Sequence, residues 1–560
     1  MSRLSICTLI VHSLDPDKSA TTMSMQLASL SDSKPSTFRL RSRNQSINRV
    51  VWLCCSFAML TAIFPVARAC FRVEVSYNEG WNIYNTVALV NHQQLYPVRY
   101  GWKTVNYPML SFEILAQLHR LTQEYLFTAR ALSLVGLAGT SFLIGAIVRI
   151  LGSSRQAAML AGFYCLALFT TDADIYVGVD DPQMFAQIFF LTGLLVYLWR
   201  RYSLLAVAAA ALFFVVGGSI KHNQIDIPLT VLIDLFLLTP RRALWFTMSG
   251  LGLAWASVAL NIHFGGPYFL AQTLLPRSWT ITKAADNLVN VLGPILAPFM
   301  AATYMAFLLR KEKHLRIASL LLVTSVLLGG FFGGGGGVSI NSLFSALLAV
   351  AILTGLFFQQ LWKSDLIHNQ NEASDEDLDN GILQQNWPKS PYLANEIKPN
   401  TFSWQFLAPL FFFAWLIIPW LLVPAINSGF NRRQWDPVLR LQETVAAQKR
   451  FDDETTMLRS LQGPAICESL LRCYFAGKPY TFDPFNSTRL IRFGKLDPSP
   501  VINNLDHRYY AAVQFDDDPV QKERSSERFD PAIEAAIEEN YVPALANEDG
   551  EIYVPRSAPH

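Results

Sequence analysis

Apolar residues in this chain gather into long runs that are separated by short polar stretches. Runs of about 16 to 25 residues match the length that an α-helix needs to cross a hydrocarbon core of about 30 Å. Because only helices and closed barrels satisfy their backbone hydrogen bonds in lipid, the pattern predicts an all-α polytopic membrane protein. We expect eleven spans, at residues 50–69, 126–148, 156–171, 183–199, 202–220, 224–239, 243–262, 287–309, 317–333, 340–361 and 403–427.

The placement of basic residues predicts how the chain is oriented. Cytoplasmic loops carry an excess of Lys and Arg, and with eleven spans all the basic clusters fall on one side. The N-terminus is therefore expected in the cytoplasm and the C-terminal region outside. These clusters contain Arg39, Arg41, Arg43, Arg49, Arg149, Arg155, Arg200, Arg201, Arg241, Arg242, Arg310, Lys311, Lys313 and Arg316.

The polar stretches divide the chain into five parts. Residues 1–49 are Ser-rich and predict a disordered cytoplasmic segment, and residues 363–402 predict a disordered acidic cytoplasmic linker. Residues 50–362 are expected to form the main transmembrane domain, with a long aromatic first outer loop at 70–125. The last span at 403–427 then leads to residues 428–560, which are long enough for a small extracytoplasmic α/β domain.

Short patterns within that last domain predict its elements. GPAIC, PYTFD and YYAAVQFD are typical of strands, and SLLRCYFAGK between the first two is typical of a helix. A later helix is expected to begin after Asp530 with Pro531 in its first turn, and a terminal hairpin to turn at Asp549 and Gly550. Cys467 and Cys473 lie close enough in sequence for a disulfide if one ends a strand and the other is on the next helix.

Composition and charge exclude two classes of protein. Only 16% of the 560 residues are charged and 51% are hydrophobic, whereas soluble proteins carry about 25% charged residues. A net charge of +2 gives no field that would recruit nucleic acid. The expected surroundings are therefore a lipid bilayer, and no nucleic-acid partner is expected.

Candidate catalytic groups are carboxylates in the outer loops. Glu79 follows the first span, and a partly desolvated carboxylate there can act as a base, although a solvated loop Glu is the plainer interpretation. Asp180 and Asp181 precede the fourth span, where one of them can cap the helix. Two adjacent acids opposite Glu79 can also share a proton or hold a divalent metal ion, with Glu79 and Asp181 as its ligands.

Candidate cations lie on the same side of the membrane. Lys221 breaks the positive-inside pattern and, with the donors of His222 and Asn223, suits a lipid phosphate. Arg130 near the outer end of the second span can add a charge to such a site. The alternative for both cations is that they extend along the bilayer to its polar surface.

Two further segments are candidates for the walls of a substrate vestibule. Asn106, Tyr107 and a proline end an extended stretch of the first loop. Gly333–Gly337 end the ninth span and Asn341 opens the tenth, so the flexible backbone there can close over a ligand or serve as a plain connector.

These motifs together resemble those of the bacterial integral-membrane glycosyltransferases with the GT-C fold, near glycosyltransferase family 39 and the protein mannosyltransferase and aminoarabinose transferase-like group. The resemblance covers about residues 50 to 362, with some likeness in the tail ICESLLRCYFAGKPYTFDPFN. It is carried by SYNEGWNIYN, NYPMLSF, VDDPQMFAQ, SIKHNQIDIPL and GGVSINSLFSALLA.

The resemblance implies an inverting transfer of a sugar from a polyprenyl-phosphate donor to a cell-envelope glycan, lipid or protein acceptor at the periplasmic face of the bacterial inner membrane. The acidic motif of the family falls on Asn78 and Glu79, so the first acid is an amide here. Glu79 is then expected as the base, with Asp180 or Asp181 as the second acid and Lys221 on the donor phosphate. The competing hypothesis is a transporter or flippase-like carrier of a lipid-linked sugar, which usually shows inverted repeats.

Overall fold

The computed structural model describes residues 34–201, 203–372, 436–516 and 528–556. Helix α2 (Lys34–Arg68) begins inside the N-terminal segment that we expected to be disordered, and α15 (Phe344–Glu372) extends into the predicted acidic linker. Both extensions lack glycine and proline beyond Pro35, which suits the first turn of a helix. The predicted span at 403–427 lies outside the described residues.

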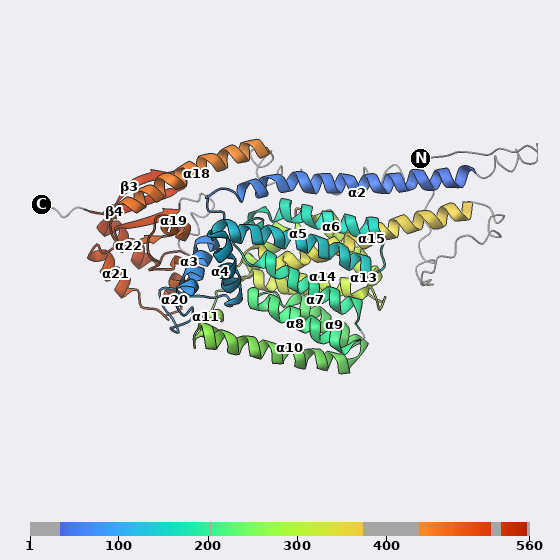
Figure 1. Cartoon of the computed structure of the whole chain (residues 1–560), viewed down its shortest axis with the longest axis horizontal. Helices are drawn as coiled ribbons and strands as arrows, with labels where there is room; N and C mark the ends of the chain where they lie inside the picture. Colours follow the sequence, from blue (N-terminus) through green and yellow to red (C-terminus); the bar gives the residue numbers. More distant parts are fainter. Residues whose placement is uncertain (1–33, 202, 373–435, 517–527, 557–560) are drawn as a thin grey trace, which may run out of the picture.

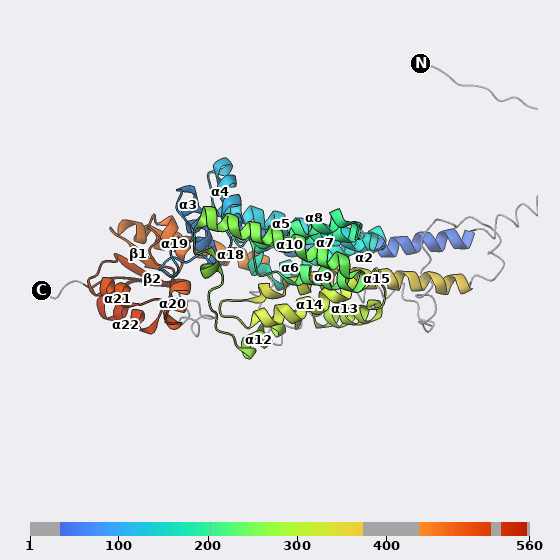
Figure 2. The same ribbon diagram turned by 90° about the horizontal axis from the view of Figure 1, so that it is seen from below.

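A bundle of side-by-side helices forms the membrane part of the molecule, and the C-terminal domain lies at one end of it (Figure 1, Figure 2). The chain is thus a multi-pass membrane protein with a small mixed sheet at its C-terminal end. The bundle consists of α2, α5 (Leu126–Ile150), α6 (Arg155–Asp172), α7 (Gln183–Trp199), α8 (Leu204–Ile220), α9 (Asp226–Leu238), α10 (Pro240–Leu260), α12 (Ile281–Leu292), α13 (Leu296–Leu309), α14 (Arg316–Gly333) and α15.

Ten of the predicted spans fall on these helices, but the helices are not equally suited to cross a bilayer. Five of them are long and apolar enough by length and composition among the described residues. Helices α7 and α8 have 17 residues and α9 has 13, which at about 1.5 Å per residue is shorter than a typical core. The segment predicted as one span at 287–309 is not a straight helix, because α12 and α13 meet at a 94° bend where Gly293 and Pro294 interrupt the helix.

The long first loop folds between the bundle and the C-terminal domain. It contains α3 (Asn78–Val90) and α4 (Leu110–Thr122), and the nearby π-helix Asn261–Gly265 and α11 (Phe269–Thr273) lie at the same end. Trp81, Tyr84 and Tyr96 from this loop are buried in one hydrophobic cluster with residues of the C-terminal domain. The aromatic residues of the loop therefore attach this domain to the membrane helices.

The C-terminal domain is a four-stranded sheet with helices around it. Its strands are β1 (Ala465–Cys467), β2 (Ala512–Asp516), β3 (Tyr541–Asn547) and β4 (Gly550–Pro555), in the order β1-β2-β4-β3. The β1–β2 pair is parallel, and the other two pairs are antiparallel. The helices are α18 (Pro437–Ser460), α19 (Leu470–Phe475), α20 (Pro484–Arg492), α21 (Ser499–Asp506) and α22 (Pro531–Asn540).

Most of the local patterns in this domain predicted the right elements. Cys467 at the end of β1 forms a disulfide with Cys473 on α19, Asp530 caps α22, and β3 turns into β4 before Gly550. The expected strand PYTFD is wrong. Its last residue, Asp483, instead accepts a hydrogen bond from the backbone N–H of Asn486 and caps α20.

Candidate functional site

Glu79 in the first turn of α3 forms a buried ion pair with Arg130 on α5. The Nε and Nη2 atoms of Arg130 each donate to one oxygen of Glu79, at 2.7 Å, and both side chains are at most 1% exposed. The other N–H groups of Arg130 donate to backbone carbonyls between residues 69 and 73. Glu79 also accepts from the backbone N–H groups of Val75 and Asp180.

This pairing leaves little capacity for the roles that the sequence suggested for these two residues. Both oxygens of Glu79 already accept two hydrogen bonds, and all five N–H groups of Arg130 are used. The geometry therefore does not favour Glu79 as a base or Arg130 as a phosphate ligand. Instead, the pair fixes the backbone of the loop that carries Asp180.

Asp181 connects three parts of the chain at the same place. Its two oxygens lie 3.3 and 3.2 Å from Nζ of Lys221, and one of them accepts from Nδ2 of Asn78 at 3.1 Å. The backbone N–H of Gln183 at the start of α7 also donates to Asp181, at 2.8 Å. Lys221 lies 3.7 Å from the centre of the Tyr107 ring, a cation–π contact.

Asp180 differs from its neighbours because one of its oxygens is free. Its Oδ1 lies 3.4 Å from Nδ2 of Asn82, and Oδ2 is buried with no hydrogen-bond partner. Burial raises the pKa of Asp180 well above its usual range, and the nearby charges of Glu79 and Asp181 raise it further. A buried carboxylate with a free oxygen and a raised pKa has the properties of a general base.

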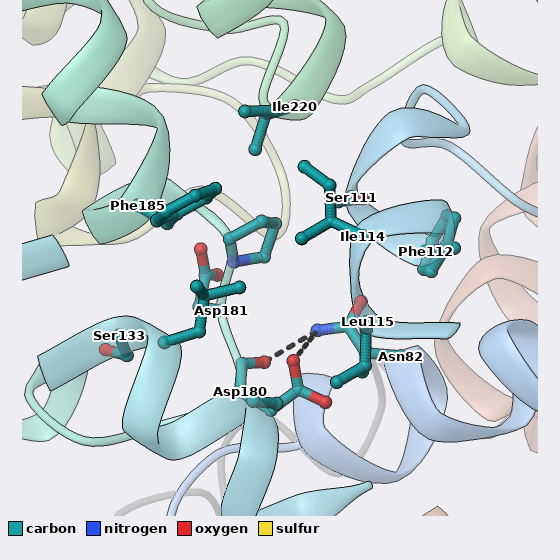
Figure 3. Close-up of a pocket in the computed structure, with 13 residues that line it drawn as sticks. Asn82, Ser111, Phe112, Ile114, Leu115, Ser133, Asp180, Asp181, Phe185 and Ile220 are labelled. Carbon is teal, nitrogen blue, oxygen red and sulfur yellow. Dashed lines mark hydrogen bonds between the residues drawn. The ribbon is translucent and has the colours of Figure 1, made fainter. Parts of the chain in front are cut away.

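Both aspartates line a small pocket at the end of the bundle (Figure 3). Asn82, Asp180 and Asp181 are polar residues of its lining, and Figure 3 shows Asn82 and Asp180 across from Ile220. The pocket is therefore lined both by carboxylates, those of Asp180 and Asp181, and by apolar side chains. The apolar residues that line it are Phe112, Ile114, Leu115, Ala129, Leu132, Pro182, Phe185 and Ile220.

The remaining predicted residues surround Lys221 and Asp181. His222 and Asn223 each have a buried side-chain atom without a hydrogen-bond partner, Nδ1 and Oδ1 respectively. Burial lowers the pKa of His222 to about 4, so its ring is neutral near pH 7. Asn341 exchanges two hydrogen bonds with the side chain of Gln183, and Asn106 is buried next to Tyr107.

The sequence analysis did not identify Arg277, a further cation at this end of the molecule. Arg277, in the segment between α11 and α12, lies near enough to Lys221 and His222 to lower the pKa of both. Like Lys221, it is a basic residue on the side where the positive-inside rule expects few, and that signal could have identified it. The amides of Asn82 and Gln183 were also missed, because nothing in the sequence pairs them with the aspartates.

The predicted metal ligands are already engaged by other groups. Within the described ranges, no three His, Cys, Asp or Glu side chains come together as a metal site. Glu79 is saturated by Arg130 and backbone N–H groups, and Asp181 by Lys221, Asn78 and Gln183. These donors fit a divalent ion poorly, because cations and N–H groups occupy the oxygens that it would need.

Removal of divalent metal ions should therefore leave activity unchanged. If the protein transfers a sugar, as the sequence resemblance implies, the rate of transfer should be the same with and without excess EDTA, since Lys221 can supply the positive charge that a metal ion would. The rate is measured before and after dialysis against the chelator. Loss of transfer that Mg²⁺ or Mn²⁺ restores would contradict this expectation.

Comparison with solved structures shows which fold the chain has. Neither a protein-family model nor a curated protein sequence matches the chain. The arrangement of helices and C-terminal domain is that of the GT-C membrane proteins. The chain is similar to crystal structures of ArnT, an aminoarabinose transferase, from Cupriavidus metallidurans.

Two ArnT structures match nearly the whole chain. The complex with undecaprenyl phosphate has a TM-score of 0.52 at 15% identity and covers 90% of this chain and 97% of that one. The apo structure has a TM-score of 0.51 at 14% identity, with coverage of 89% and 96%. At this identity the similarity establishes a shared fold that includes the C-terminal domain.

Proposed function

We propose that the protein is a membrane glycosyltransferase that moves a sugar from a polyprenyl-phosphate donor to an acceptor, with inversion at the anomeric carbon. The observation that carries the proposal is Asp180, which lines a pocket with an apolar wall beside the Lys221–Asp181 ion pair and whose buried Oδ2 has no hydrogen-bond partner. The ArnT-like fold and the undecaprenyl phosphate bound to ArnT support a lipid-phosphate donor.

The reaction is proposed to occur at the periplasmic face. Arg201 donates to the carbonyls of Lys313 and His314, so two of the basic clusters share one end of the bundle. The candidate site adjoins the C-terminal domain through the first loop. The positive-inside rule assigns the basic end to the cytoplasm and the site to the opposite side.

Lys221 is proposed to hold the phosphate of the donor. Two of its contacts, with Asp181 and Tyr107, fix the position of its ammonium group. His222 and Asn223 have unpartnered atoms beside it, and these are proposed to bind polar groups of the donor. The apolar wall of the pocket suits the first isoprene units of the lipid.

The transfer itself needs one base and one cation. The acceptor hydroxyl attacks the anomeric carbon and forms the new C–O bond, while its proton moves to Oδ2 of Asp180. The bond from the anomeric carbon to the phosphate oxygen breaks, and its electron pair leaves with the phosphate. Lys221 stabilises the charge that develops on that oxygen. Asp181 and the Glu79–Arg130 pair position these two groups without contacting the reacting atoms.

A direct test is binding of undecaprenyl phosphate to the full-length protein in lipid nanodiscs. The Lys221→Met variant should bind it at least tenfold more weakly, because a charge-assisted contact in a buried site is lost. Arg242→Met, a basic residue at the opposite end of the bundle, serves as the control and should bind normally. Equal affinity in both variants would remove Lys221 from the donor site.

The pH range in which kcat/KM for sugar transfer is high should be narrower than an Asp and a Lys with their usual pKa values would give. The carboxylate form of Asp180 is the base, so kcat/KM falls as the pH falls through its raised pKa. The ammonium form of Lys221 holds the phosphate, and burial lowers the pKa of Lys221, so kcat/KM also falls earlier on the alkaline side. In Lys221→Arg the alkaline limb should move to higher pH. An alkaline limb that does not move in this variant would contradict the assignment.

A further inference from the structure

Arg489 on α20 is a buried cation with most of its hydrogen-bonding capacity unused. Its side chain is 8% exposed, and Nη2 donates to Oδ1 of Asn486 at 2.9 Å. Its Nε and Nη1 atoms are buried with no hydrogen-bond partner. Leaving a charged donor buried and unsatisfied is costly, so such a group in a native protein usually faces an anion or water.

The nearest carboxylate is not available to Arg489. Asp483 accepts hydrogen bonds from Tyr77 at 2.7 Å and Trp81 at 3.1 Å, both on the first loop. It also accepts from the backbone and the side chain of Asn486. With four donors already in place, Asp483 has no capacity left for the free N–H groups of Arg489.

A second arginine, Arg277, lies near Arg489, and the glycine run packs against the helix that carries Arg489. Arg277 donates to the carbonyl of Gly336 at 3.4 Å, and no ion pair is recorded for it in the described residues. The ring of Phe485, one turn before Arg489, packs on Gly337, where a Cβ atom would lie 2.1 Å from the ring. The positive φ of Gly337 adds a second reason for glycine there.

The electrostatics agree with an anion between the two arginines. Burial and the charge of Arg277 lower the pKa of Arg489 to about 9, and the nearby charge of Asp483 offsets this lowering only in part. Burial also lowers the pKa of Arg277. An anion bound between the two guanidinium groups would satisfy the free donors and neutralise this charge.

We propose that Arg489 and Arg277 form an anion-binding site between the C-terminal domain and the membrane helices, for a phosphoryl group of a substrate. The role of this site rests on the proposed function, because Arg277 also lies near Lys221 and His222. Two sources share this chemistry: the phosphate of the lipid donor and an anionic group on the acceptor. Gly337 of the glycine run packs against Phe485, and this contact holds the C-terminal domain next to the membrane helices so that both contribute to the site.

The test is binding of inorganic phosphate to full-length protein, by calorimetry in nanodiscs. Arg489→Gln should bind phosphate at least tenfold more weakly than wild type, because it loses two charge-assisted donors. Arg492→Gln changes an exposed arginine on the same helix and should bind like wild type. Arg489→Lys keeps the charge and should recover part of the affinity, which separates loss of the site from misfolding. Equal affinity in Arg489→Gln and Arg492→Gln would overturn the proposal.

Competition then distinguishes the two sources. If saturating undecaprenyl phosphate displaces inorganic phosphate from the Arg489 site, the site holds the donor phosphate. If both bind together, it holds the acceptor. Binding of inorganic phosphate does not require sugar transfer, so the anion site can be confirmed even if transfer is never observed. A failed test of the anion site can therefore be told apart from a failed test of the proposed function.

Discussion

Replacing Asp180 with asparagine should reduce the rate of sugar transfer about 10²- to 10⁴-fold, the range that a general base usually contributes. The asparagine side chain keeps the size and shape of the aspartate, but it cannot take a proton at the position of Oδ2, the oxygen that has no hydrogen-bond partner. Donor binding should be unchanged, because Asp180 does not contact Lys221. The rate is measured in a single turnover with a saturating donor, so that chemistry is separated from binding.

Asp174→Asn is the matched control for this variant. Asp174 lies just before the same loop and pairs with Arg440 on α18, away from the pocket. A partly exposed ion pair contributes little, so this variant should keep both its fold and its turnover. Normal transfer by Asp180→Asn would eliminate Asp180 as the base.

Replacing Arg130 with methionine should destabilise the protein by about 3–5 kcal/mol, because it leaves the buried charge of Glu79 without its partner. The double variant Glu79→Gln, Arg130→Met removes both charges and should recover much of that loss. Each variant is measured by thermal unfolding in the same detergent, and the four proteins form a double-mutant cycle.

The same cycle separates a structural Glu79 from a catalytic one. If Glu79 positions the Asp180 loop, Glu79→Gln should lower the unfolding temperature and turnover together. Loss of turnover in Glu79→Gln at full thermal stability would instead support the role that the sequence suggested for this residue. Arg68→Met offers a comparison, since Arg68 also donates to carbonyls of the neighbouring loop but makes no recorded ion pair with Glu79.

The sequence predicted the helices better than it predicted the partners of the site residues. Apolar runs identify membrane helices because burial in lipid depends on composition along one segment. The pairings of Glu79 with Arg130 and of Asp181 with Lys221 join positions 51 and 40 residues apart, and no local pattern specifies them. A carboxylate that looks free in sequence can therefore be saturated in the fold.

The amide at position 78 has a physical explanation that only the structure provides. Nδ2 of Asn78 donates to Asp181, which also accepts from Lys221. A carboxylate at position 78 would face Asp181 with like charge in a buried place, where such repulsion is strong. Asn78 is thus a departure from the family motif that suits this cluster of acids.

The C-terminal side of the site was the hardest part to predict. Asp483 lies about 400 positions from the residues of the first loop that it contacts, and the sequence pattern predicts a strand for the segment that ends at Asp483. Its position depends on docking of a whole domain, which includes the contact of Phe485 with Gly337. Sequence patterns describe each element separately and do not encode such a contact.

The most direct measurement of the central claim is transfer of labelled sugar from undecaprenyl-phosphate donors by the purified protein in nanodiscs. A panel of donors with different sugars is incubated with envelope extract as the acceptor source, and both glycosylated product and released undecaprenyl phosphate are quantified. The proposed function predicts equal amounts of both from wild type and, in the same time, at least about a hundredfold less of both from Asp180→Asn. Movement of intact donor across vesicle membranes without release of undecaprenyl phosphate would contradict it and favour a carrier.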